Sequence, residues 1–264
     1  MEDKLPSDVL KTLKQYEIIS NSTSQVSYCR IYEGTINKNF QVKDGESEFL
    51  LKVFEGNSVL PINRKRTFRL QEELAIFGLA PQPLFLSEDA TIYCEQWIDY
   101  KVMNTDSNLN ALAEALHQVH SAFVSAPVLS LIEHWREYSA LSKKNNSYSF
   151  QQHYQTMLVK WTDYTKQYSE DFVLCHNDLH ISHVCSPSGP LLDWEYAGLG
   201  CRYFDIASCC IINQLNPECK KTLCDEYAAL ANSSADEILA RVNQVYEFVE
   251  FTNGLWVDAV DFEQ

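Results

Sequence analysis

The sequence predicts an α+β protein with two lobes, a small antiparallel β-rich lobe over residues 1–98 and a larger, mainly helical lobe over residues 99–264. Three observations predict this division. The chain has 264 residues, of which 45% are apolar, enough to bury two cores. Its first part carries short segments of β-branched and aromatic residues between turns. In the remainder, apolar residues recur mostly at the spacing of amphipathic helices.

In the first lobe, the sequence predicts a helix, a sheet and a second helix. The first helix is expected over Ser7–Gln15. A polar helix is expected over Asn63–Phe77, and the segment Gly78-Leu79-Ala80-Pro81 stops it, because glycine and proline break helices. Five segments rich in β-branched and aromatic residues are expected as strands: Ser27–Glu33, Phe40–Val42, Phe49–Phe54, Gln82–Leu86 and Thr91–Trp97.

In the second lobe, the pattern becomes helical from Asp106 onward. Either Asp106 or Asn108 can cap the first helix, whose apolar residues recur at Leu109, Leu112, Leu116 and Val119. Two short strands are expected within Val173–Asp193, around the turn at residues 186–189. Further helices are expected over Leu129–Lys143, Tyr148–Tyr168, Pro217–Ala231 and Ala235–Phe251.

The chain is strongly acidic. It has 21 basic and 36 acidic side chains, which give a net charge of -15. Nucleic-acid backbones and anionic lipid surfaces repel such a chain, so we expect neither a nucleic-acid partner nor a membrane partner. A nucleotide whose phosphates are neutralised by divalent cations is compatible with this charge, and a cationic small molecule would be attracted.

The nine cysteines are expected to be reduced and mostly buried thiols, because they contain no CxxC pair and form no even framework. The first six residues lack the apolar stretch of a secretion signal. No apolar run approaches the roughly 20 residues that span a bilayer. We therefore expect the cytoplasm as the location, and the oligomeric state stays open.

Two aspartates on either side of one predicted turn give the strongest chemical signal. Asp178 lies in LCHNDLHISH, residues 174–183, and Asp193 lies in LLDWEYAG, residues 191–198. Phosphoryl transfer needs one carboxylate to orient the acceptor hydroxyl and another to hold the metal that bridges the phosphates. The order and separation of the two aspartates fit these tasks, although both could also be ordinary turn residues.

These segments resemble the aminoglycoside phosphotransferase and choline kinase superfamily, relatives of the protein kinases, and are most like its choline, ethanolamine and thiamine kinase branch. The resemblance implies a two-lobed protein-kinase-like fold and transfer of a phosphoryl group from ATP, with Mg²⁺ or Mn²⁺, to a small-molecule hydroxyl. It makes His176 and Asp178 catalytic residues and Asp193 a metal ligand. Asp205 then matches a structural buttress of the catalytic loop.

The resemblance also implies nucleotide contacts in the first lobe. Lys52, the one cation in the apolar run FLLKVF, matches the kinase lysine that neutralises phosphate charge. Its predicted partner is Glu72 or Glu73, and spacing cannot choose between them. Glu95 and Trp97 occupy the position of the hinge, whose backbone usually reads the adenine edge. An edge-strand lysine in solvent is the alternative for Lys52.

The sequence departs from the family pattern at two places. His183 stands where the family has an asparagine that helps to hold a metal. Either one metal held mainly by Asp193 suffices, or His183 binds a softer divalent ion, or catalysis is impaired. The phosphate loop, residues 20–27, contains no glycine, so Ser22 and Ser24 are the candidate phosphate donors, with a plain polar turn as the alternative.

For the acceptor, aromatic and acidic residues near Asp193 and in the C-terminal helix suggest a site for an ammonium group. The candidates are Glu195, Tyr196, Glu250 and Trp256. These aromatic residues could instead pack the core. Choline, ethanolamine or thiamine ranks first as the acceptor, and an aminoglycoside or another amino alcohol or sugar ranks second.

Two other functions remain open at this point. A nucleotide-binding pseudokinase would bind nucleotide without turnover. A metallohydrolase could use the crowded ligands His176, Asp178, His180 and His183, although their spacing matches no zinc template. The kinase interpretation further expects Asp178 and Asp193 to meet Lys52 across an interlobe crevice.

Overall fold

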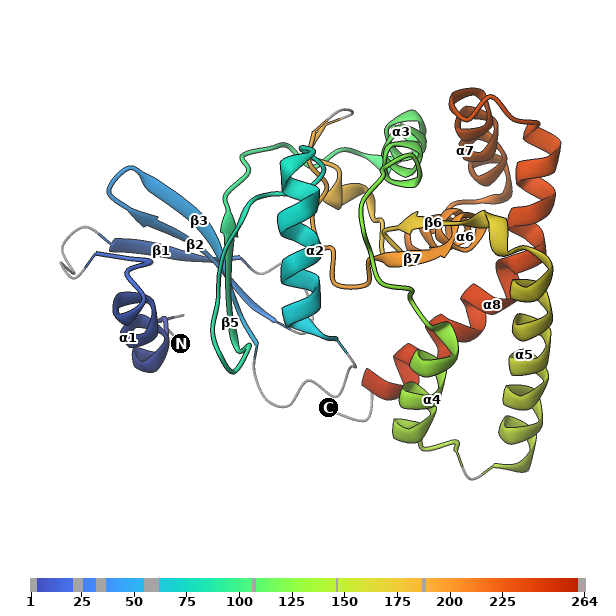
Figure 1. Cartoon of the computed structure of the whole chain (residues 1–264), viewed down its shortest axis with the longest axis horizontal. Helices are drawn as coiled ribbons and strands as arrows, with labels where there is room; N and C mark the ends of the chain where they lie inside the picture. Colours follow the sequence, from blue (N-terminus) through green and yellow to red (C-terminus); the bar gives the residue numbers. More distant parts are fainter. Residues whose placement is uncertain are drawn as a thin grey trace. The chain divides into compact units, whose positions relative to one another are not determined.

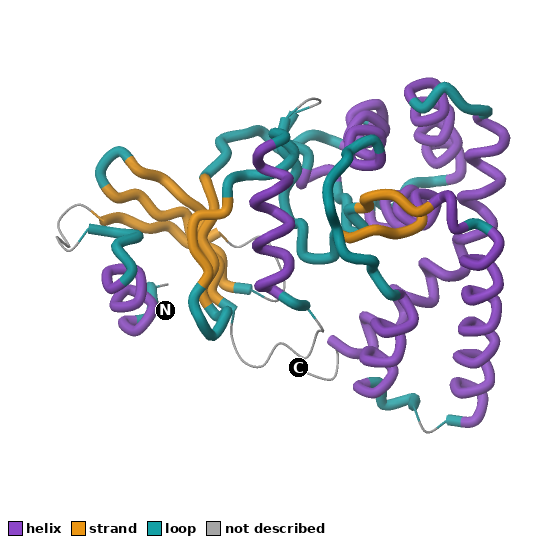
Figure 2. The backbone as a smooth tube through the Cα atoms, viewed as in Figure 1, coloured by secondary structure: helices purple, strands orange, loops and turns teal. Residues whose placement is uncertain are grey.

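The computed structural model describes residues 4–20, 26–31, 37–54, 62–105, 108–145, 147–186 and 189–260. The chain divides into two compact units. One comprises Met1–Ser58 and Asn63–Tyr100, and the other comprises Val59–Ile62 and Lys101–Gln264. The first is built around strands and the second mainly from helices, as Figure 2 shows. The predicted α+β class is therefore confirmed.

The first unit contains an antiparallel five-stranded sheet with the order β1-β2-β3-β5-β4. Each strand overlaps a predicted one, with ends that differ by a few residues. Two helices accompany the sheet, α1 (Ser7–Gln15) and α2 (Arg64–Ile76), as labelled in Figure 1. The strands are β1 (Val26–Ile31), β2 (Lys38–Asp44), β3 (Ser47–Val53), β4 (Pro83–Leu86) and β5 (Ile92–Gln96).

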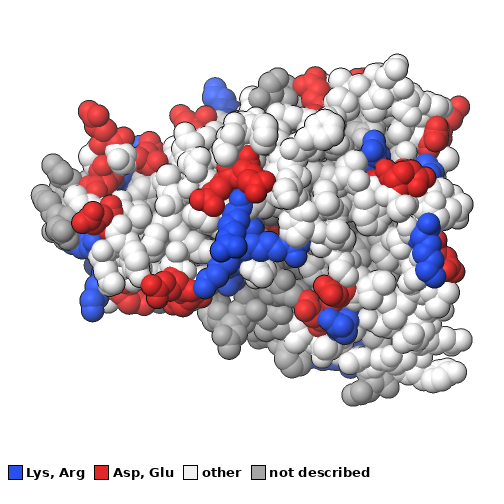
Figure 3. All heavy atoms as spheres, viewed as in Figure 1, with Lys and Arg blue, Asp and Glu red and all other residues white. Residues whose placement is uncertain are grey.

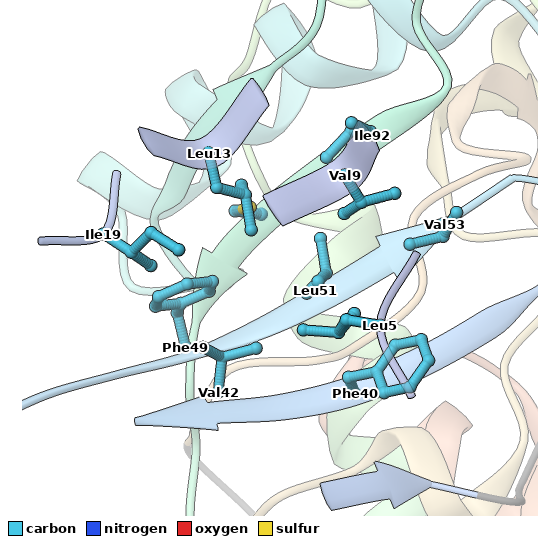
Figure 4. Close-up of a cluster of buried hydrophobic side chains, with 11 residues drawn as sticks. Leu5, Val9, Leu13, Ile19, Phe40, Val42, Phe49, Leu51, Val53 and Ile92 are labelled. Carbon is cyan, nitrogen blue, oxygen red and sulfur yellow. The ribbon is translucent and has the colours of Figure 1, made fainter. Parts of the chain in front are cut away.

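Helix α1 covers one face of this sheet. Its buried residues Val9 and Leu13 pack on alternate residues of β3 and β5, such as Leu51 and Ile92 (Figure 4). Leu13 and Leu51 are completely buried. Because successive side chains of a strand point to opposite faces, the residues between them must face the other way.

Helix α2 covers that other face. Its N-cap is Asn63, whose side-chain oxygen accepts a hydrogen bond from the backbone of Arg66 at 3.1 Å. Phe68 makes an edge-to-face contact with Tyr93 of β5, with ring centroids 6.1 Å apart. Lys52 of β3 is paired directly with Tyr93 in the antiparallel register. The predicted kinase lysine therefore lies on the face of the sheet that α2 covers.

The second unit contains six helices among its described residues, and α8 packs against α4, α6 and α7. Its core is aromatic: Trp135 is fully buried and contacts Phe251, with ring centroids 5.0 Å apart. Figure 1 shows α8 as the long red helix of this unit. The helices are α3 (Leu109–His120), α4 (Leu131–Leu141), α5 (Tyr148–Gln167), α6 (Arg202–Ile212), α7 (Pro217–Leu230) and α8 (Ala235–Val260).

The strands of this unit differ from the prediction. The structure pairs β6 (Phe172–Cys175) with β7 (Gly198–Cys201), so the two strands enclose the whole 176–197 segment. The expected hairpin around residues 186–189 is reduced to one antiparallel bridge between Val184 and Leu191. Turn signals predicted the local reversal correctly, but strand pairing depends on a partner distant in sequence.

Two helices of this unit also differ from the prediction, one in its end and one in its existence. Helix α8 continues nine residues beyond the expected end at Phe251, to Val260, and passes through Gly254. Helix α6 was not predicted, because its residues are apolar on nearly every side: eight of its eleven residues are buried. A fully buried helix shows no apolar stripe by which periodicity could identify it.

A close backbone approach makes Gly198 hard to replace. A Cβ atom there would lie 2.8 Å from the carbonyl oxygen of Pro127, which accepts a hydrogen bond from the Leu199 backbone at 2.9 Å. We expect Gly198→Ala to lower the free energy of unfolding by about 1–3 kcal/mol. Gly200→Ala is the matched control, because its Cβ would meet nothing closer than 3.7 Å. Urea denaturation of the two variants checks this, and equal midpoints would contradict it.

The cysteines are in the reduced state that the sequence predicted. All nine cysteines are free, and six of them are buried. On the face drawn in Figure 3, acidic and basic side chains are interspersed. Among the described residues, no helix is both long enough and apolar enough to cross a bilayer.

Candidate active site

The side chain of Asp205, on α6, fixes the start of the segment that begins at His176. The Asp205 carboxylate accepts hydrogen bonds from the backbone N–H of His176 at 2.8 Å and of Asn177 at 2.7 Å. Asp205 is fully buried. Burial alone would raise the pKa of this carboxyl, but its hydrogen bond with His120 and the nearby groups hold the pKa below its usual value. This arrangement fits the structural role predicted for Asp205.

His120 of α3 connects this carboxylate to α7. Its Nε2 lies 3.1 Å from the Asp205 carboxylate and its Nδ1 lies 2.8 Å from the hydroxyl of Tyr227. Burial lowers the pKa of His120, so the ring is neutral. The neutral ring then donates to Asp205 through Nε2 and accepts from Tyr227. His120 is thus a structural residue, which links α3 to α6 and α7.

His176 lies inside the protein with none of its surface exposed. Its Nε2 donates to the carbonyl of Leu192 at 2.9 Å, and its Nδ1 accepts from the backbone N–H of Asp178 at 3.3 Å. Burial lowers the pKa of this ring as well. A group with no exposed surface cannot reach a substrate, so we revise the predicted catalytic role of His176 to a positioning role. It ties the Asp178 backbone to the segment that carries Asp193.

Two asparagines that the sequence did not single out also shape this loop. Asn213, which follows α6, accepts from the backbone of Ile181 at 2.8 Å and donates to the carbonyl of Leu179 at 2.9 Å. Asn177 donates to the carbonyl of Tyr196 at 3.0 Å. An asparagine just after a helix usually signals only a helix end. Nothing in the local pattern could therefore have shown that Asn213 supports the loop.

The ring of His183 lies between the backbone of Asp178 and the carboxylate of Asp193. Nδ1 of His183 lies 2.9 Å from the carbonyl oxygen of Asp178, and Nε2 lies 4.0 Å from a carboxylate oxygen of Asp193. Burial lowers the pKa of His183 to about 4, so the ring is neutral. The fold therefore brings both predicted aspartates to one histidine, although fifteen positions separate them in the sequence.

Two residues of this region are among the six described non-glycine residues with a positive φ. Asn177 has φ +64° and Asp193 has φ +65°, in the left-handed region that residues other than glycine rarely adopt. Such conformations often occur at functional sites, where the surrounding contacts hold them in place. Asn177 directly precedes Asp178, and Asp193 is itself the predicted metal ligand.

Tyr196 joins several polar groups near Asp178. Its hydroxyl accepts a hydrogen bond from Nε1 of Trp256 at 3.1 Å and is hydrogen-bonded to Tyr138. Burial raises the pKa of Tyr196 well above its usual value, and nearby Tyr138, Glu195 and Asp178 add to this effect. The predicted acceptor residues Tyr196 and Trp256 are thus brought together, and the negative charges of Glu195 and Asp178 act on Tyr196.

The structure corrects the placement of Glu250. This residue lies on the exposed side of α8, near Tyr246. On the same helix, Phe248 and Phe251 pack against the buried Trp135. The helical periodicity of α8 sends these side chains in different directions.

In the first unit, α2 lies on the same face of the sheet as the Lys52 side chain, and burial shows which α2 residues point towards that face. Lys52 is only 9% exposed. Glu72 and Glu73 both lie on the exposed side of α2, whereas Gln71 is buried. Gln71 donates to the carboxylate of Glu95 at 2.5 Å. The sheet-facing residue at this turn of α2 is therefore Gln71, and the pairing of Lys52 with Glu72 or Glu73 stays a prediction.

The other predicted nucleotide residues take different positions. Glu95 is 3% exposed, and its carboxylate accepts hydrogen bonds from Gln71 and from the Tyr93 hydroxyl at 2.8 Å. Any contact of Glu95 with a nucleotide must therefore use its backbone. Trp97 directly follows β5 and is partly exposed. Ser22 and Ser24 lie outside the described residues.

A family model described as the phosphotransferase enzyme family (APH) matches residues 27–238. This match covers most of the chain and includes the β-sheet, the 176–183 loop, Asp193 and Asp205. The chain therefore belongs to the phosphotransferase enzyme family.

Three individual proteins illustrate the similarity. Protein LicA of Haemophilus influenzae is 23% identical over 239 residues, which cover 86% of this chain and 68% of that protein. The structure of choline kinase LicA from Streptococcus pneumoniae matches with a TM-score of 0.71 at 19% identity and covers 96% of this chain and 92% of that one. An ethanolamine kinase of Plasmodium vivax matches with a TM-score of 0.76 at 15% identity and covers 98% and 82%. At these identities the structural matches show the two-lobed kinase-like fold.

Proposed function

We propose that this phosphotransferase moves the γ-phosphoryl group of ATP to the hydroxyl of a small cationic amino alcohol of the choline, ethanolamine or thiamine type. The observation that carries the proposal is the contact of Tyr196 with Trp256, where the negative charges of Glu195 and Asp178 act on Tyr196. Aromatic faces and nearby negative charge attract ammonium groups. The names of the similar choline and ethanolamine kinases agree with this class of acceptor.

In the proposed reaction, Asp178 orients the acceptor hydroxyl and receives its proton. His176 and Asp205 accept hydrogen bonds from the backbone N–H groups of Asp178 and Asn177, and His183 contacts the Asp178 carbonyl, so the backbone is held on both sides of the Asp178 side chain. A fixed backbone holds the carboxylate in one place, so little reorganisation is needed when the hydroxyl reacts. Lys52 is proposed to neutralise the α- and β-phosphates, and Trp97 with the Glu95 backbone to contact the adenine.

The donors around Asp193 fit a divalent cation. A carboxylate oxygen of Asp193 and Nε2 of His183 face each other, and both side chains are partly exposed. Mg²⁺ or Mn²⁺ bound there would neutralise the charge that develops on the transferred phosphoryl group. The role of Asp193 in this proposal is to hold that cation, and the role of His183 is developed below.

An ADP-release assay tests the proposed function. The purified protein is given ATP with Mg²⁺ or Mn²⁺ and, separately, choline, ethanolamine, thiamine, an aminoglycoside and a neutral alcohol of similar size. We expect acceptor-dependent ADP release with one of the first three. If ADP is released only with the aminoglycoside, the acceptor belongs to the second-ranked class, the aminoglycosides and other amino alcohols or sugars. Nucleotide-dependent thermal stabilisation without ADP release from any acceptor would contradict the proposal and favour a pseudokinase.

The aromatic contact can be tested separately. Trp256→Leu is expected to raise KM for a cationic acceptor by about 5- to 30-fold, the loss of a contact of about 1–2 kcal/mol, with KM for ATP unchanged. Tyr246→Leu is the matched control on the same helix, because its ring already lies 4.4 Å from the ammonium group of Lys220. Steady-state kinetics with both substrates varied gives the two constants. Equal effects of the two substitutions would show that Trp256 does not contact the acceptor.

A further inference from the structure

The contact between His183 and the backbone of Asp178 fixes where the ring carries its proton. Nδ1 lies 2.9 Å from the Asp178 carbonyl oxygen, which can only accept a hydrogen bond. Nδ1 must therefore be the donor. The backbone N–H of His180 lies 3.4 Å from the same nitrogen. Two donors do not bond to each other, and the shorter contact takes precedence because hydrogen bonds weaken with distance.

The other ring nitrogen consequently has a lone pair that is turned towards Asp193. Nε2 lies 4.0 Å from Oδ2 of Asp193, too far apart for a hydrogen bond. Two metal–ligand bonds of about 2.1 Å can span this separation. The side chains of His183 and Asp193 are 18% and 34% exposed, so both groups are open to solvent.

We propose that Nε2 of His183 and the carboxylate of Asp193 bind the divalent cation of the phosphoryl-transfer site together, and that this ring nitrogen shifts the site's preference from Mg²⁺ towards Mn²⁺. The inference rests on the proposed function, because it assigns the metal of that same site. Among the three alternatives that the sequence left open, the fixed tautomer favours direct binding by His183.

The chemical reason is the difference between the two ions. Mg²⁺ prefers oxygen ligands, loses its water molecules reluctantly and demands near-ideal octahedral geometry. Imidazole nitrogen suits the transition-metal ions better than it suits Mg²⁺. A site in which one oxygen donor is replaced by an imidazole nitrogen therefore loses affinity for Mg²⁺ relative to Mn²⁺.

The test detects a nitrogen ligand directly and does not depend on turnover. The full-length protein is loaded with Mn²⁺ and ADP and measured by electron spin-echo envelope modulation. The sample is prepared with natural histidine and with ¹⁵N-labelled histidine, which separates protein nitrogen from adenine nitrogen. We expect a ¹⁴N modulation that changes to ¹⁵N on labelling and disappears in His183→Asn.

His180→Asn is the matched control. The His180 ring lies next to the same loop, but its Nδ1 is within 2.7 Å of the Ser182 hydroxyl. We expect this variant to keep the histidine modulation. Competition titrations should further show that the ratio of Mg²⁺ to Mn²⁺ dissociation constants falls about tenfold in His183→Asn, the scale on which one altered group of a metal site changes affinity. Thermal melting of both variants verifies that they are folded.

The outcomes separate the two proposals. Bound Mn²⁺ without histidine modulation would overturn the assignment of His183, while ADP release with Mg²⁺ would leave the proposed function standing. A signal lost in His180→Asn and kept in His183→Asn would likewise overturn it. If the protein binds neither nucleotide nor metal under any condition, the proposed function fails together with this inference.

Discussion

Asp178→Asn is expected to lower kcat by about 10²- to 10⁴-fold, the range in which a positioned general base contributes. The amide has nearly the same size as the carboxylate but cannot receive the hydroxyl proton. Nucleotide affinity should change little, because Asp178 is proposed to contact the acceptor and not the phosphates. Acceptor-dependent ADP release gives kcat, and isothermal titration with ADP gives the affinity.

Asp225→Asn provides the comparison for this substitution. Asp225 lies on α7 and is paired with Lys221 one helical turn earlier, at 2.6 Å, with both side chains exposed. We expect kcat to be unchanged in this variant, since exposed ion pairs contribute little even to stability. Turnover of Asp178→Asn within a factor of about three of wild type would refute the proposed role of Asp178.

Asp205→Ala is expected to produce the largest loss of stability, about 3–5 kcal/mol in the free energy of unfolding. The substitution leaves the backbone N–H groups of His176 and Asn177 and the Nε2 of His120 without their buried acceptor. Urea denaturation measures the loss. Asp258→Asn, at a partly exposed ion pair with Lys144, should cost less than about 1 kcal/mol under the same conditions.

The contribution of Asp205 to the free energy of unfolding should decrease at low pH. Its pKa in the folded protein lies below the usual value of 3.8, so the folded state binds its proton less readily than the unfolded state. The stabilisation is therefore fully present above about pH 4 and is lost as the pH falls through the lower folded value. The difference in urea midpoint between wild type and Asp205→Asn should narrow below about pH 4. A constant difference from pH 7 to pH 3 would contradict this linkage.

The pattern of the sequence was sufficient to predict most elements of secondary structure. Helix α1 was predicted with its observed ends, and α2 was predicted to within one residue at each end. These features depend on residues within a few positions of one another. Helix α6 escaped the analysis because burial on all sides removes the periodicity that identifies a helix.

The sequence also predicted most residues of the candidate site. It identified which residues belong there more reliably than it identified what each of them does. Asp178, Asp193 and Asp205 were identified by their motifs, and the fold brings them to one loop. Glu250 was assigned to the acceptor site from composition, yet α8 turns it to the surface. Composition shows that an aromatic or acidic residue is available, whereas helical phase decides which way it points.

The sequence by itself determined the class of fold and identified the acidic pair to which the proposed phosphoryl transfer is assigned. Only the tertiary structure decided what each buried polar group does: His176 positions the loop, His120 supports Asp205, and His183 turns a ring nitrogen towards Asp193. The physical reason is that a histidine's tautomer is set by the hydrogen-bond partners around it. Many of those partners lie far away in the sequence, 85 positions in the case of His120 and Asp205, and packing alone brings them within 3.1 Å.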